Sequence, residues 1–132
     1  MPGFTEKKRV LDVDDEHIVA DTLAKIFSNE GYETKSAYSA EEALAIVLEW
    51  RPHLAIVDVC LPGISGIDLA ILFKAEYPDC KITLFSGQSA ASDFLETARQ
   101  SGHSFDVLAK PVHPTKLLSV ASYLLSPSEG GA

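Results

Sequence analysis

The feature that most constrains the fold is an alternation, repeated five times, of a short strand-like run and a longer amphipathic segment. Repeated strand and helix patterns predict an α/β domain with a parallel sheet, right-handed crossovers and helices on both faces. One run is apolar at every position until it ends in Asp58, which is typical of a central strand buried on both faces. The predicted strands span 9–13, 33–37, 54–58, 81–85 and 105–109.

Apolar residues at helical spacing mark the segments between these strands. Gly31 is placed to end the first helix, and Ser39 with Glu42 forms a capping-box pattern that opens the second. We expect the buried faces to carry Ile18, Val19, Thr22, Leu23, Ile26 and Phe27 in the first helix; Ala40, Ala43, Leu44, Val47 and Leu48 in the second; Leu69, Leu72 and Phe73 in the third; Phe94, Leu95 and Ala98 in the fourth; and Leu117, Leu118, Ala121, Leu124 and Leu125 in the last.

Length and composition predict one cytoplasmic domain. The 132 residues are enough for a core without a disulfide or structural metal, and we place that core at about 7–125, with a flexible tail at 126–132. The net charge of −8 argues against direct binding to nucleic acid. No segment has the pattern of a signal peptide or a membrane span, and Cys60 and Cys80 are expected to be reduced, with no zinc-binding pattern around them.

Polar side chains follow four of the five predicted strands. Asp14-Asp15-Glu16 follows the first strand, Asp58 ends the third, and Ser86 and Lys110 follow the fourth and fifth. Because parallel strands all end at one edge of the sheet, these side chains are expected to converge there. Gathered carboxylates repel one another unless a cation lies between them, and hard oxygen ligands favour Mg²⁺.

These residues lie within motifs that resemble the receiver domains of two-component response regulators along nearly the whole chain. The matching motifs are Val13-Asp14-Asp15-Glu16, the D-x-x-L-P-G-x-x-G segment from Asp58 to Gly66, Ser86-Gly87 and Lys110-Pro111. The resemblance implies a doubly wound (βα)5 flavodoxin-like domain with a five-stranded parallel sheet of order 2-1-3-4-5.

The resemblance also implies a role for each residue of the site. Asp58 would be the phosphoacceptor, Lys110 would pair first with Asp58 and then with a phosphoryl oxygen, and Ser86 would bond another phosphoryl oxygen. A cis Lys110-Pro111 bond would aim the lysine into the site.

The implied Mg²⁺ ligands come from two strand ends, the first and the third. Asp15 and Asp58 would bind the ion directly, Asp14 mostly through a water, and Cys60 through its backbone carbonyl.

In such a domain phosphorylation alters the face made by the fourth helix, the fifth strand and the last helix. Val107 stands where relatives usually carry a switching aromatic, so we expect it to pack, and Phe105 is the nearby aromatic. Cys60 and Gln88 occupy the positions that tune self-dephosphorylation in the family.

The implied donor is a sensor histidine kinase or a histidine phosphotransfer protein, and the implied target is a downstream protein. The altered face is a candidate for homodimer formation. Such a domain is not an enzyme in the conventional sense. It is either a stand-alone protein or one domain of a longer chain.

Three other readings remain open. Asp12-Val13-Asp14 resembles the D-x-D motif of haloacid-dehalogenase-type phosphatases, with Asp12 as nucleophile. An FMN-binding module would share the fold class, although an acidic turn after the first strand would repel a phosphate. The third is a receiver-like interaction module that does not take phosphate. In the receiver reading, Asp12 is expected to reach a partner or solvent, and neither His17 nor His113 is given a catalytic role.

Overall fold

The computed structural model describes residues 7–87, 96, 99, 100, 102, 105–110 and 112–126. One parallel sheet of five strands runs through the domain in the order β2-β1-β3-β4-β5, as the sequence predicts. The elements are β1 (Arg9–Val13), α1 (His17–Asn29), β2 (Glu33–Ala37), α2 (Ala40–Glu49), β3 (Leu54–Asp58), α3 (Gly66–Glu76), β4 (Lys81–Ser86), β5 (Asp106–Ala109) and α5 (Pro114–Leu125). The predicted fourth helix, with Phe94, Leu95 and Ala98, and the tail from 127 onward lie outside the described residues.

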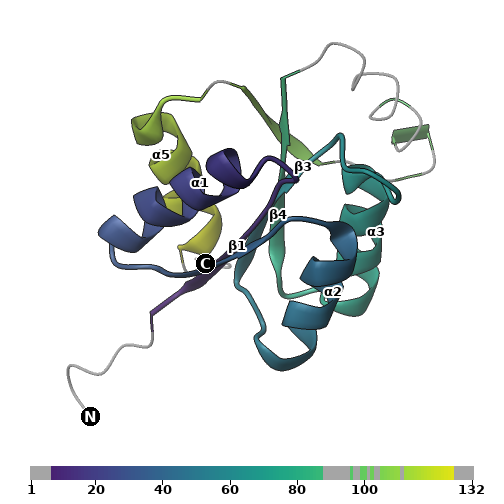
Figure 1. The fold of residues 1–132 in the computed structure, drawn as a ribbon, viewed down its shortest axis with the longest axis horizontal. Coiled ribbons are helices and arrows are strands. Elements are labelled where there is room, and N and C mark those ends of the chain that lie inside the picture. The colour runs from purple at the N-terminus through teal and green to yellow at the C-terminus, as the bar shows by residue number, and fades with distance from the viewer. Residues whose placement is uncertain are drawn as a thin grey trace, which may run out of the picture.

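Helices cover both faces of the sheet. Figure 1 shows α1 and α5 on one face and α2 and α3 on the other. Alternate residues of each strand point to opposite faces, so the two faces form two separate core clusters. Leu11, Val57 and Phe73 belong to the cluster on the α2 and α3 side, whereas Phe27 and Ile56 belong to the cluster on the α1 and α5 side.

Local signals set the helix ends much as expected. The Ser39 hydroxyl accepts from the Glu42 N–H at 3.1 Å, and the Glu42 carboxylate accepts from the Tyr38 N–H at 2.9 Å. Gly31 follows α1 with a φ of +97°, a left-handed conformation that costs glycine little. The His113 ring caps α5 by accepting from the Thr115 N–H at 3.1 Å.

Four of the expected buried positions are wrong. Ile18 is 83% exposed and Leu48 is 69% exposed. The face of α1 that meets the sheet is centred on Ala20, and Ile18 lies about 200° around the helix from it. Leu48 is one residue past the buried Val47, which turns it toward solvent. Thr22 and Leu72 are also exposed.

No helix in the described part of the chain is both long enough and apolar enough to span a bilayer.

Candidate functional site

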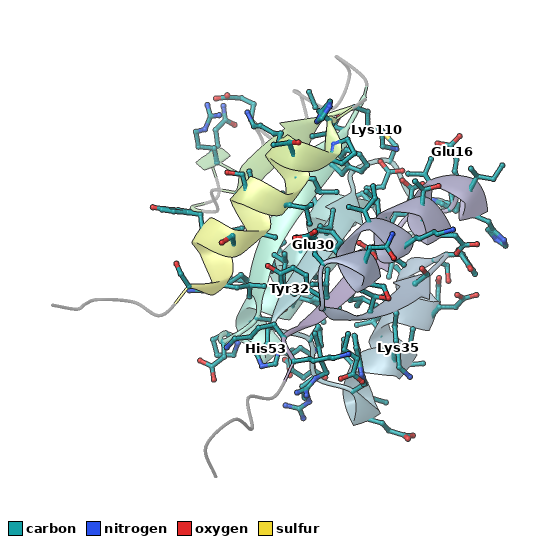
Figure 2. The ribbon with its side chains drawn as sticks, turned by 90° about the vertical axis from the view of Figure 1, so that its left-hand side faces the viewer. Glu16, Glu30, Tyr32, Lys35, His53 and Lys110 are labelled. Atoms are coloured by element: carbon teal, nitrogen blue, oxygen red, sulfur yellow. The ribbon has the colours of Figure 1, made fainter. Side chains whose placement is uncertain are left out.

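The carboxyl ends of β1, β3, β4 and β5 meet at one edge of the sheet. The strand order puts β1 next to β3, and β3 next to β4, so residues distant in sequence become neighbours there. Backbone hydrogen bonds continue past the strand ends: the Val59 N–H donates to Phe85 at 3.0 Å, and the Lys110 N–H donates to Ser86 at 2.9 Å. Figure 2 shows Lys110 and Glu16 at this edge and His53 toward the opposite end.

Three carboxylates gather at this edge. Asp14 and Asp58 are buried and Asp15 is exposed, and one oxygen of each lies within 4.8 Å of the others. The Glu16 N–H donates to Asp14 Oδ1 at 2.9 Å and fixes one side of that carboxylate. Such a set of hard oxygen donors, open to solvent through Asp15, suits a divalent cation such as Mg²⁺.

The ammonium of Lys110 lies between two of these carboxylates. Its Nζ is 3.1 Å from Asp14 Oδ2, 3.5 Å from Asp58 Oδ1 and 3.9 Å from Glu16 Oε1. The site therefore combines acidic oxygens and one cation in a partly buried setting, where electrostatic interactions are stronger than in water. This arrangement can balance the charge of an incoming anionic group.

Burial sets the protonation of the central groups. Desolvation, reinforced by Asp14, raises the pKa of Asp58 to about 6, although Lys110 and the Cys60 N–H act in the opposite direction. Burial alone would lower the pKa of Lys110, but its bonds to Asp14 and Asp58 outweigh this and raise it. Lys110 is therefore charged at neutral pH, and Asp58 is mostly ionised.

The connection after β3 holds Asp58 in place. The Cys60 N–H donates to Asp58 Oδ1 at 3.3 Å, and the Gly66 N–H donates to the Val59 carbonyl at 2.9 Å. The Ser65 hydroxyl accepts from the Asp68 N–H at 3.1 Å and starts α3 directly beside the strand end. The segment from Asp58 to Gly66 thus forms a compact loop around the candidate acceptor.

The residues considered for the switch, Ser86, Val107 and Phe105, lie at different distances from the site. Ser86 ends β4 next to the site and pairs with Ala109 of β5. Val107 is 42% exposed on the edge strand β5, so whatever packing it makes leaves much of its side chain open to solvent. Phe105 packs at the other end of β5 from Lys110, with Lys74 Nζ 5.3 Å from its ring centroid, too far along the strand to contact the acceptor site. Gln88 and Pro111, and with Pro111 the predicted cis bond, lie outside the described residues.

The expectation that Asp12 reaches a partner or solvent is wrong. Its carboxylate is fully buried within β1 and, among the described residues, has no hydrogen-bond partner, so it reaches neither a partner nor solvent. Burial raises its pKa well above the usual value. A phosphate ester cannot reach a carboxyl group that is fully buried, so Asp12 cannot act as a nucleophile. This removes the main support for the hypothesis of a haloacid-dehalogenase-type phosphatase.

Sequence reasoning paired Lys110 with Asp58 and missed its contacts with Asp14 and Glu16 and with an aromatic ring. Lys110 Nζ lies 5.1 Å from the centroid of the Phe85 ring. Phe85 directly precedes Ser86, but its ring points to the α1 and α5 side of the sheet, where it joins the core. An apolar residue in a predicted strand is read as core, so no signal in the sequence distinguished it.

Comparison with known proteins agrees with the geometry. The family model described as the response regulator receiver domain matches residues 10–122. Regulatory protein VanR of Enterococcus faecium is 34% identical over 113 residues, which cover 84% of this chain and 47% of that protein. The DNA-binding response regulator MtrA of Mycolicibacterium smegmatis is 30% identical over 115 residues, covering 87% of this chain and 49% of MtrA. The chain thus spans about half the length of these relatives.

Solved structures give the same answer. The receiver domain of NtrX from Brucella abortus superimposes with a TM-score of 0.79 at 32% identity, over 90% of this chain and 99% of that one. A CheY-like response regulator receiver domain protein from Methanospirillum hungatei JF-1 gives 0.77 at 30% identity, over 90% and 94% of the two chains. With the strand order, the acidic cluster and Lys110 at the strand ends, these matches establish that the chain belongs to the response regulator receiver domain family.

Proposed function

We propose that this chain is a phosphorylation-dependent signalling switch in which the Asp58 carboxylate accepts a phosphoryl group. The observation that carries the proposal is the position of Lys110 Nζ, 3.5 Å from Asp58 and 3.1 Å from Asp14, beside a cluster of three carboxylates. Phosphoryl transfer needs alignment and positive charge more than covalent chemistry from the protein, and this site offers both.

Asp58 acts as the nucleophile in this proposal. One Asp58 oxygen forms a bond to phosphorus while the bond from phosphorus to the donor atom breaks and its electron pair leaves with the donor. Lys110 neutralises charge on a phosphoryl oxygen and Ser86 donates its hydroxyl to another. Asp14, Asp15, Asp58 and the Cys60 carbonyl are the residues that would hold Mg²⁺. The ion would supply further positive charge to the transferring group.

Acetyl phosphate tests the acceptor. With Mg²⁺, we expect intact mass spectrometry to find one phosphoryl adduct on the wild-type protein and none on Asp58→Asn, because the amide is not a nucleophile at phosphorus. Asp68→Asn makes the same chemical change at an exposed carboxylate on α3 and should leave the adduct in place. An adduct of equal yield on Asp58→Asn would refute Asp58 as the acceptor.

Mg²⁺ binding should weaken in acid. Asp58 has a pKa of about 6, so only about a tenth of it is ionised at pH 5, and the apparent Mg²⁺ affinity should be about tenfold lower at pH 5 than at pH 7. Isothermal titration calorimetry at the two pH values measures this change. Asp58→Asn should bind Mg²⁺ more weakly and lose this part of the pH dependence, whereas equal wild-type affinities at both values would contradict the ligand role of Asp58.

The remaining assignments follow from family membership and are proposals. The donor is a sensor histidine kinase or a histidine phosphotransfer protein, and the protein works in the cytoplasm. Residues 1–132 form one receiver domain, which is not a conventional enzyme: it promotes only its own phosphorylation and dephosphorylation, with Cys60 and Gln88 tuning the latter. Some relatives are named DNA-binding regulators. The net charge of −8 argues that this chain does not itself contact nucleic acid.

The output face in this proposal includes β5 and α5. Val107 and Tyr123 are 42% and 80% exposed there and offer apolar area to a downstream protein or to a second copy of the chain. Because Val107 has no ring to turn inward, the response of this face must use a device other than aromatic rotation at that position.

A further inference from the structure

The Lys110 side chain is confined by the two residues on either side of Ser86. A Cβ at Gly87 would lie 3.1 Å from Lys110 Cβ and 3.4 Å from Lys110 Cδ, so the lysine stem packs directly on the glycine backbone. Beyond the stem, Nζ lies 5.1 Å from the centroid of the Phe85 ring. Residues 85 and 87 therefore contact the two ends of one functional side chain.

The core packing fixes the Phe85 ring beside the Lys110 ammonium. Phe85 pairs with Asp58 across the sheet, which places it next to the strand that carries the candidate acceptor. Its side chain is only 4% exposed and packs in the core cluster with Leu23 and Leu108. A ring held in this way cannot swing aside, so it is a rigid surface for the ammonium.

The Phe85 ring attracts the Lys110 ammonium without using any of its N–H groups, which remain available for hydrogen bonds. A cation near an aromatic ring is attracted electrostatically, and the attraction grows when water is excluded. Three carboxylates, those of Asp14, Glu16 and Asp58, compete for Nζ, and Glu16 is on the exposed side of the site. A flexible lysine could follow Glu16 toward solvent, whereas the ring favours the position between Asp14 and Asp58.

We propose that Phe85, with Gly87 behind the lysine stem, is a positioning residue that holds Lys110 Nζ at the place where it meets the transferring phosphoryl group. This inference rests on the proposed function, because it assigns to Phe85 a part in phosphoryl acceptance at Asp58. It gives an apolar core residue of β4 a role that its sequence position does not reveal.

A set of three variants tests the role. Phe85→Leu removes the ring and keeps an apolar side chain, whereas Phe85→Tyr keeps the ring. Phe85 is one of the residues that line a groove of about 510 Å³ between α1 and the residues that follow β5. Phe27→Leu is the matched control, because Phe27 is fully buried in the same core cluster but lies near the far end of α1.

The first readout is the rate of phosphorylation by acetyl phosphate with Mg²⁺, followed by intact mass. We expect Phe85→Leu to lower the rate at saturating acetyl phosphate about threefold to tenfold, with a smaller change in the half-saturating concentration. Phe85→Tyr should restore the rate to within about twofold of wild type, and Phe27→Leu should match wild type, since its ring does not touch Lys110. Equal rates for Phe85→Leu and wild type, a slow Phe85→Tyr, or an equally slow Phe27→Leu would each overturn the proposal.

The second readout does not depend on phosphorylation. A ring near Nζ shifts the NMR resonances of the Lys110 ε-methylene, so we expect them at an unusual position in the wild type and Phe85→Tyr and at the ordinary lysine position in Phe85→Leu. An ordinary position in the wild type would overturn the contact itself. If the wild type accepts no phosphoryl group although the resonance is shifted, the proposed function fails and the catalytic part of this inference fails with it, while the packing of Lys110 on Phe85 stands.

Discussion

Gly66→Ala is expected to lower the free energy of unfolding by about 3 kcal/mol or more, a large part of the stability of a domain this size. A Cβ at this position would lie 1.8 Å from the Asp58 carbonyl oxygen, 2.7 Å from the Asp58 carbonyl carbon and 2.9 Å from Val59 Cα. All three are backbone atoms, so no side-chain rotation can relieve the clash. The start of α3 would have to move away from the end of β3.

That movement would also break the hydrogen bond from the Gly66 N–H to the Val59 carbonyl, which is 2.9 Å long. Because this bond closes the loop that begins at Asp58, we expect phosphoryl acceptance to fall even in the protein that remains folded. The glycine that ends the D-x-x-L-P-G-x-x-G motif is thus required for space and not for backbone conformation.

Urea unfolding measures the change, with Gly31→Ala as the control. Gly31 has a φ of +97° and, were it to carry a Cβ, no described neighbour within 4 Å, so alanine there should cost only the strain of the left-handed backbone, about 1 kcal/mol. If Gly66→Ala were no less stable than Gly31→Ala, the close approach of α3 to β3 would not be the reason for the glycine.

Asp12→Val is expected to raise the free energy of unfolding at pH 7 by about 2 kcal/mol or more. The Asp12 carboxyl is fully buried, and neither of its oxygens has a hydrogen-bond partner in the described structure. Its neighbours across the sheet are Ile56 and Ser36, and Val10 precedes it on the same face. The Ser36 hydroxyl donates to the Ala20 carbonyl and not to Asp12, so valine at position 12 leaves no hydrogen bond unmade.

The gain should depend on pH in a defined direction. Burial raises the pKa of Asp12 in the folded protein above its unfolded value of about 3.9, so the folded state holds the proton more tightly. The free energy of unfolding of the wild type therefore falls as the pH rises from about 4 through the folded pKa, by up to about 1.4 kcal/mol per pH unit. The advantage of Asp12→Val should shrink as the pH is lowered toward 4.

Thr83→Val is the matched control for this effect. The Thr83 hydroxyl is buried on the same face of the sheet as Asp12, the face that α1 and α5 cover, and it has no hydrogen-bond partner among the described residues. Unlike a carboxyl group, a hydroxyl does not titrate between pH 4 and pH 8. Its removal should stabilise the protein by about 1 kcal/mol, equally at every pH. Urea unfolding between pH 4.5 and 7.5 separates the two variants, and a constant difference between Asp12→Val and wild type would show that Asp12 has an ordinary pKa.

The sequence by itself determined the strands, their order along the chain and the residues at their ends. Strand and helix patterns differ in period, and polar residues such as Asp58 and Lys110 interrupt apolar runs at the points where the strands end. Once the sheet is parallel, its carboxyl ends must share one edge. The position of Lys110 beside the acidic cluster, 96 residues away from Asp14, is therefore predictable without coordinates, whereas its shorter contact with Asp14 than with the expected Asp58 is not.

Only the tertiary structure decided the environment of individual side chains. Ile18 and Leu48 fit the apolar period, yet they face solvent because each lies one or two residues away from the line of contact with the sheet. Asp12 is an acidic residue, yet its carboxyl group is buried between α1 and the sheet. The sequence pattern predicts that Phe85 is a core residue, and the structure shows that it also lies beside Lys110. Burial and contact depend on which neighbours the packed chain brings to a residue. Local periodicity predicts roughly which side of a helix faces the sheet. The packed structure decides which residues at the edge of that side are buried.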